Sequence, residues 1–303
     1  MKQTVFQSAT GIPRTLMLWD SPQQSRACVL IIHGMAEHIA RYQRLAQALN
    51  SQGLAMAGFD LPGHGGDIPA ERLGYFDDAD GWGKLLADIH TARALTQQAW
   101  PGVPLVMLGH SMGSFALRSY LLSYPAPDAV ILSGTGSQPL PVVAFGKAVA
   151  ALLCLPGGGK KPSQFINKLA FSANNKPFAP ARTSMDWLSR DEEEVDKYVR
   201  DSLCGFVFTA KGYRDFFDGL LSLRNPRPLD VVNKELPILL ISGESDPVGG
   251  MGKGVRQVGE GYTKAGFKDV SVRLYPQARH EVFNETNRDD VTRDVADWIV
   301  KRF

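Results

Sequence analysis

The sequence predicts an α/β protein with a mostly parallel central sheet, helices on both faces of the sheet and an inserted helical cap. Short apolar runs without polar alternation, typical of strands buried on both faces, alternate along the chain with segments of helical periodicity. This alternation stops between Thr135 and Glu235 and then resumes. Alternating strands and helices favour a covered parallel sheet, and the interruption favours an insertion into it.

Six apolar runs are predicted strands of the parallel sheet, and an earlier run is predicted at the sheet edge. The six are Cys28–His33, Leu54–Asp60, Pro104–Gly109, Asp128–Gly134, Pro237–Ser242 and Val270–Tyr275, and the edge strand is Thr15–Asp20. Three segments have apolar residues at helical spacing. They are Tyr42–Gly53, where Gly53 is a suitable C-cap, Trp82–Trp100 and the C-terminal Val291–Phe303.

The interrupted interval is too long for a simple connection between two strands. We therefore assign residues 1–134 and 236–303 to the core and residues 135–235 to an inserted cap. Its apolar run Leu140–Pro156 contains Lys147, and a bilayer span needs about 20 apolar residues, so we expect a buried or interfacial helix. The acidic run Ser189–Asp201 is expected to be a solvated helix face.

Composition narrows the class of protein. The 303 residues carry a formal net charge of +2 without a Lys/Arg block, which argues against a nucleic-acid partner. The three cysteines, Cys28, Cys154 and Cys204, are widely spaced and odd in number, which favours free thiols in a reducing compartment. The N-terminus lacks the pattern of a signal peptide. We expect a cytoplasmic protein.

The stretch GHSMG, residues 109–113, follows a predicted strand and precedes a helical segment. This is the G-x-S-x-G pattern, in which a sharp strand-to-helix turn strains the serine and exposes its Oγ above the sheet. Small residues two positions to either side let the strand and the helix approach closely. The pattern therefore identifies Ser111 as a candidate nucleophile rather than a helix N-cap.

A serine hydroxyl needs a base to take its proton, and the base needs a carboxylate to orient it. Of the six histidines, His280 follows the last strand on a loop that can reach the carboxyl edge of the sheet. Asp246 follows the strand Pro237–Ser242 and emerges at the same edge, with Glu244 as the alternative acid. The chain order Ser111, Asp246, His280 is one in which such triads occur.

Backbone amides are the expected donors to the oxyanion of an acyl-transfer intermediate. The Met112 amide directly follows the candidate nucleophile. Gly34, after the strand Cys28–His33, permits a tight turn that would aim the Met35 amide at the serine. Met35 and Met112 are therefore the expected oxyanion hole. The residues expected to shape the pocket floor, without a catalytic role, are Glu37, His38, Asp60, His64 and His110.

The set HGMAEHIARY, GFDLPGHG, GHSMGS, SGESDPV and RHEVFNE, between His33 and Glu285, resembles the monoacylglycerol lipase and lysophospholipase branch of the α/β-hydrolases, the serine aminopeptidase-like hydrolases. The resemblance implies the α/β-hydrolase fold and a serine hydrolase of single-acyl-chain lipid esters, with a cap over an acyl channel. By motif it assigns nucleophile, acid and base to Ser111, Asp246 and His280. The sequence departs from the pattern at Ala36, where the monoacylglycerol lipases usually have glycine.

The expected function is ester hydrolysis through an acyl-enzyme on Ser111, with a small lipid ester as substrate and with no cofactor or metal. Two alternatives stay open. An aminopeptidase-type amide hydrolase would use the same triad and would need an acidic cap residue to hold the substrate's α-ammonium. A non-catalytic member of the fold would only bind a ligand. Contact of the apolar cap helix with a membrane surface is also left open, and the sequence makes no prediction of oligomeric state.

Overall fold

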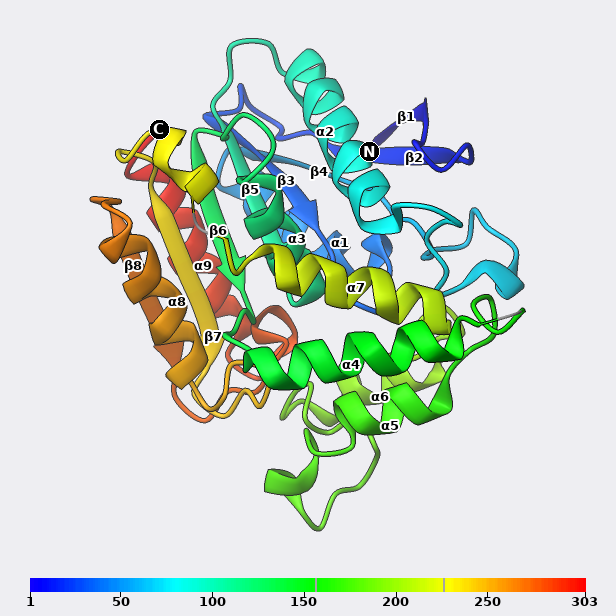
Figure 1. Cartoon of the computed structure of the whole chain (residues 1–303). Helices are drawn as coiled ribbons and strands as arrows, with labels where there is room; N and C mark the ends of the chain where they lie inside the picture. The colour runs from blue at the N-terminus through cyan, green and yellow to red at the C-terminus, as the bar shows by residue number, and fades with distance from the viewer. Residues whose placement is uncertain (156, 226) are drawn as a thin grey trace.

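The computed structural model describes residues 1–155, 157–225 and 227–303, and these residues form an eight-stranded sheet of order β1-β2-β4-β3-β5-β6-β7-β8 (Figure 1). The strands are β1 (Lys2–Gln7), β2 (Pro13–Trp19), β3 (Ala27–Ile32), β4 (Leu54–Gly58), β5 (Leu105–His110), β6 (Ala129–Ser133), β7 (Ile238–Gly243) and β8 (Val270–Tyr275). β2 is antiparallel to both of its neighbours, and all other neighbouring strands are parallel. The predicted mostly parallel sheet is confirmed.

Helices cover both faces of this sheet. They are α1 (Gln43–Ser51), α2 (Gly81–Ala99), α3 (Met112–Tyr120), α4 (Leu140–Leu153), α5 (Gln164–Phe171), α6 (Glu192–Arg200), α7 (Ala210–Ser222), α8 (Lys253–Lys264) and α9 (Arg288–Val300). Successive residues of β3 enter opposite cores: Ile31 belongs to the core that includes α1 and α9, whereas Leu30 and Ile32 belong to the core that includes α2, α3 and α8. Strands β3 to β7 are buried on both faces, which explains their continuous apolar sequences, whereas β8 at the carboxyl-terminal edge is only partly buried.

The amino-terminal edge of the sheet differs from the prediction. The expected edge strand, Thr15–Asp20, corresponds to β2, which is not at the edge because it pairs with both β1 and β4. The edge strand is β1, in which Phe6 is the one buried residue. A strand with so little buried surface has no apolar run, so the sequence pattern gave no indication of it.

Helices α4 to α7 lie between β6 and β7 in the chain and gather on one side of the sheet, where α7 contacts α2 and α3 (Figure 1). Helix α4 buries Val143 and Ala150 and exposes other apolar side chains, as expected for an interfacial helix. Two residues of the predicted cap interval, Pro156 and Pro226, lie outside the described residues. No helix in the described ranges combines the length and the apolar character that crossing a bilayer requires.

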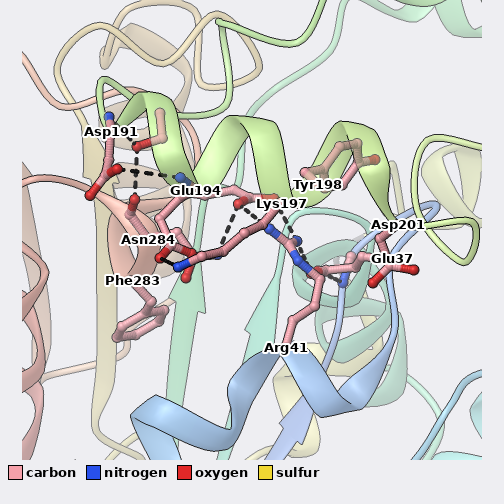
Figure 2. A network of polar contacts seen from close by, with 12 residues as sticks. Glu37, Arg41, Asp191, Glu194, Lys197, Tyr198, Asp201, Phe283 and Asn284 are labelled. Carbon is pink, nitrogen blue, oxygen red and sulfur yellow. Dashed lines mark hydrogen bonds and ion pairs between the residues drawn. The ribbon is translucent and has the colours of Figure 1, made fainter.

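The acidic run Ser189–Asp201 differs from the prediction of a solvated helix face, because part of it is buried against the core. Glu192 and Glu193 are exposed, but the Glu194 side chain is only 11% exposed and pairs with Arg44 at 3.0 Å. Figure 2 shows Glu194 and Tyr198 of α6 on the side of the helix that faces Arg41 of the core. Composition alone predicts solvation for such a run, whereas here basic residues of the core lie opposite its inner face.

Candidate active site

The candidate nucleophile lies in a strained turn between β5 and α3. Ser111 has φ 50° and ψ −119°, a conformation that residues with a side chain rarely adopt. A Cβ atom added to Gly109 would lie 2.4 Å from the Gly113 carbonyl oxygen, and one added to Gly113 would lie 2.0 Å from the Ile32 carbonyl oxygen. The two glycines of the pattern are therefore required by the close approach of strand and helix.

The candidate base and acid form a buried pair beside this turn. His280 Nδ1 lies 2.9 Å from Asp246 Oδ1, which also accepts a hydrogen bond from the Val248 amide at 2.9 Å. The Ser242 hydroxyl donates to the other carboxylate oxygen at 2.8 Å. The alternative acid, Glu244, is exposed and makes no contact with His280 among the described residues.

Two opposing effects set the protonation of this pair. Burial lowers the pKa of His280, but the Asp246 carboxylate more than compensates, and the net pKa lies above its ordinary value. Burial likewise raises the pKa of Asp246, and the charge and hydrogen bond of His280 bring it below its ordinary value. Both directions describe a carboxylate that holds and stabilises the imidazolium.

A cavity of about 680 Å³ contains Ser111, His280, Met35 and Met112 in its lining. Among the described residues, the backbone amides of Met35 and Met112 have no hydrogen-bond acceptor, and His280 Nε2 has no partner. The structure thus brings the predicted nucleophile, base and oxyanion donors to one cavity, with Asp246 buried behind His280. The cavity continues between apolar side chains of the interval 135–235, which include Val143, Phe145, Ile166, Phe206, Phe216, Phe217 and Leu220.

A buried ionic network that sequence reasoning missed surrounds the candidate oxyanion loop. Glu37 accepts hydrogen bonds from the Gly34 amide at 2.5 Å and from Arg41 at 2.6 Å. Arg41 also makes two hydrogen bonds with the carboxylate of Glu281, the residue after His280. Burial raises the pKa of Glu37, but the charge of Arg41 and the hydrogen bond from the Gly34 amide outweigh this effect and bring the pKa to about 2. Arg41 therefore links the oxyanion loop to the loop of the candidate base (Figure 2).

The residues expected to shape the pocket floor fall into two groups. Glu37 and His110 line the cavity, and the ring of His110 lies 4.9 Å from that of His280. Burial and the neighbouring His280 lower the pKa of His110 to about 4, which keeps its ring neutral. Asp60 and His64 are not in the cavity lining. They instead accept hydrogen bonds from backbone amides of the loop at residues 36–39.

His38, the last of the residues expected to shape the pocket floor, also lies outside the cavity lining and contacts Asp201. In the part of the chain that the structure describes, one group of side chains has the composition and spacing of metal ligands. It consists of His38, Asp201 and Cys204, whose donor atoms lie within 4.8 Å of one another. The three cysteines are free thiols.

Known proteins that resemble this chain are lipases and esterases, and a family model matches most of its length. Residues 23–287 match the family model described as serine aminopeptidase, S33. A monoacylglycerol lipase of Mycolicibacterium smegmatis is 29% identical over 97% of this chain and 95% of its own length. Phospholipase YtpA of Bacillus subtilis is 25% identical over 88% of this chain and 92% of its own length. The crystal structure of a thermostable carboxyl esterase from Bacillus coagulans, in complex with glycerol, superposes with a TM-score of 0.91, with 26% identity over 99% of this chain and 98% of that one.

Proposed function

The chain belongs to the serine aminopeptidase S33 family of α/β-hydrolases, and on this premise we propose that it is a carboxylic ester hydrolase of single-acyl-chain lipids, monoacylglycerols or lysophospholipids. The observation that supports it most is the buried His280–Asp246 pair beside a strained Ser111, at one end of a largely apolar cavity. Relatives named monoacylglycerol lipase, phospholipase and carboxyl esterase support the same reaction class.

The proposed reaction proceeds through an acyl-enzyme. Ser111 Oγ attacks the ester carbonyl while His280 Nε2 accepts its proton, since Nδ1 is held by Asp246. The Met35 and Met112 amides donate to the oxyanion, and each such donor contributes about 10²–10³ in rate. The intermediate collapses as His280 protonates the leaving alcohol. A water molecule, deprotonated by the same histidine, then attacks the acyl carbonyl and releases the fatty acid and Ser111.

The lining of the cavity favours an ester of an acyl chain over an aminopeptidase substrate. An aminopeptidase needs an unpaired acidic group to hold the α-ammonium. The described part of the interval 135–235 contributes no Asp or Glu to the lining. The two acidic residues that do line it, Glu37 and Glu281, are both paired with Arg41, so neither is an unpaired acid. An apolar wall with few polar groups is what an acyl chain requires.

We further propose that residues 135–235 form a cap that contacts lipid surfaces. We also propose that the protein is located in the cytoplasm, because its three cysteines are free thiols. Helices α4 and α5 and the segment between them expose large apolar side chains: Leu140, Val142, Phe145, Leu152, Leu153, Leu155, Phe165 and Leu169. Exposed apolar patches of this kind mark interaction sites. The double variant Leu152→Ser/Phe165→Ser, at two positions outside the cavity lining, should weaken binding to phosphatidylcholine vesicles and leave hydrolysis of a soluble short-chain ester unchanged.

The test of the function is kcat/KM across esters from acetyl to palmitoyl, with monoacylglycerols and lysophosphatidylcholines as head-group series. We expect activity that rises with chain length and is lost in Ser111→Ala. An optimum at acetyl would contradict the acyl cavity. Cleavage of amino-acid amides with a free N-terminus, in preference to the esters, would establish the aminopeptidase alternative. A folded wild-type protein without activity on either class would favour the ligand-binding alternative.

A further inference from the structure

A second cluster of reactive side chains lies between the oxyanion loop and the segment that follows α6. His38 comes from the core, and Asp201 and Cys204 come from one turn in which the Cys204 amide donates to the Asp201 carbonyl at 3.0 Å. His38 Nε2 lies 2.9 Å from Asp201 Oδ2, and the Cys204 sulfur completes a group whose donor atoms are within 4.8 Å of one another. The proposed ester hydrolysis uses none of these three side chains.

The electrostatic surroundings of this cluster favour a cation. The charged groups that act on the Cys204 thiol include the carboxylates of Glu37, Asp201 and Glu281 and the guanidinium of Arg41. These carboxylates outnumber the guanidinium around a cysteine that is 8% exposed. A divalent cation would balance this excess of negative charge.

We propose that His38, Asp201 and Cys204 bind Zn²⁺. Imidazole nitrogen, thiolate sulfur and carboxylate oxygen are all zinc ligands, and the sulfur discriminates against Mg²⁺ and Ca²⁺. Zinc–ligand bonds of about 2.0–2.3 Å place tetrahedral ligands about 3.3–3.8 Å apart, so side-chain rotations of about 1 Å close the site. Asp201, with a side chain 34% exposed, opens the fourth position to water. Binding releases the Cys204 thiol proton to solvent.

The ion would join two segments that already meet at Ala36. The Ala36 carbonyl accepts hydrogen bonds from the Tyr198 hydroxyl and the Gly205 amide, both at 2.9 Å. Tyr198 and Asp201 lie near Glu37 at the same end of α6 (Figure 2). Ala36 follows Met35, the proposed oxyanion donor. Zinc would therefore fix this segment against the oxyanion loop. Zinc binding itself does not depend on the proposed esterase function.

The experiment titrates Co²⁺, a spectroscopic substitute for Zn²⁺, into the chelator-treated protein. We expect one equivalent to produce a thiolate-to-cobalt charge-transfer band together with the visible bands of a tetrahedral site, and Zn²⁺ to displace it. Cys204→Ser should abolish the charge-transfer band and weaken Zn²⁺ binding by more than about 100-fold, a larger loss than is usual when a residue that only orients a metal ligand is changed. Cys154→Ser, which alters a free thiol outside the cluster, should change neither measurement.

A wild-type protein without a thiolate band, or a band that persists in Cys204→Ser, would overturn the proposal. Asp201→Asn and His38→Gln provide second variants should Cys204→Ser not fold, and each should weaken Zn²⁺ binding measured by calorimetry. Unchanged affinity in both would also overturn it. Because cobalt spectra and calorimetry do not require turnover, they separate this proposal from the proposed ester hydrolysis, which Ser111→Ala tests.

Discussion

Nδ1 of His280 lies 2.9 Å from Oδ1 of Asp246, and the two side chains are 2% and 0% exposed. A carboxylate so thoroughly buried is retained only where its hydrogen bonds are satisfied, and here Ser242 and Val248 satisfy the positions that His280 leaves. The pair therefore fixes one ring orientation of His280, with Nε2 directed away from Asp246. Two predictions concern this relationship.

The first prediction concerns the acid. Asp246→Asn keeps the size of the side chain, but its amide cannot hold His280 in the tautomer that accepts a proton at Nε2. We expect kcat to fall by about 10⁴, as is typical of this change in a serine triad. Steady-state kinetics on the preferred ester measures the loss. Glu244→Gln is the matched control, since Glu244 is exposed, and it should leave kcat unchanged. An equal loss of kcat in Asp246→Asn and Glu244→Gln would contradict the proposal that Asp246 is the residue that orients His280.

The second prediction concerns pH. His280 must be neutral to act as a base, and its pKa is raised above the ordinary 6.5. His280 therefore keeps its proton up to a higher pH than a free imidazole does. We expect kcat/KM to fall as the pH decreases through the raised pKa of His280, which lies above 6.5. In Asp246→Asn the carboxylate charge that raises the pKa is gone, so the residual activity should decline at lower pH than in the wild type. A pH–rate profile of both proteins tests this. An acid limb that does not move would contradict it.

The buried strands could be predicted because each is apolar on both faces, as the sequence of β3 shows. The turn at Ser111 was predictable because its two glycines recur in a fixed local pattern: Gly109 is required by backbone contact with the helix that follows it, and Gly113 by contact with the backbone of β3. β1 was not predictable, because only Phe6 is buried in it. Local sequence thus predicts strands that carry apolar runs, the edge strand β8 among them. It does not predict a strand such as β1, which buries a single side chain.

Contacts between distant segments could not be predicted in this way. Arg41 and Glu281 are 240 positions apart, and nothing in either local sequence indicates that they meet. The same holds for His38 and Asp201, because their contact depends on how the segment after α6 packs against the core. The acidic run was predicted to be solvated because charge patterning carries no information on which basic residues lie opposite.

The third prediction concerns Arg41. Its side chain is 11% exposed and pairs with Glu37 and Glu281, which are 4% and 7% exposed. Arg41→Met would leave two buried carboxylates without a counter-charge, and we expect the free energy of unfolding to fall by about 3–5 kcal/mol. Urea denaturation measures this change.

The control for Arg41 is Arg293→Met. Arg293 pairs with Asp290 at the surface, where the side chains are 63% and 60% exposed. Such a pair contributes at most about 1 kcal/mol. A loss in Arg41→Met no greater than that of the control would mean that the two carboxylates find other partners or solvent, and the linking role of Arg41 would be abandoned.

The last prediction concerns the backbone strain at Ser111, whose φ is 50°. Ser111→Gly and Ser111→Ala both remove the hydroxyl, but only glycine adopts this conformation without steric cost. Strain of this kind costs about 1–3 kcal/mol, and glycine loses part of that gain through the entropy of the unfolded chain. We expect Ser111→Gly to be more stable than Ser111→Ala by about 1 kcal/mol in urea denaturation.

The same pair of substitutions at Ser114, in the first turn of α3, should give the opposite order. There the backbone is helical, and glycine is about 1 kcal/mol less favourable than alanine. A reversal of sign between two positions three residues apart would attribute the effect to the turn itself. Equal stability of Ser111→Gly and Ser111→Ala would mean that the turn relaxes once the hydroxyl is removed. The strain at Ser111 would then depend on the serine side chain rather than on the close packing of β5 against α3.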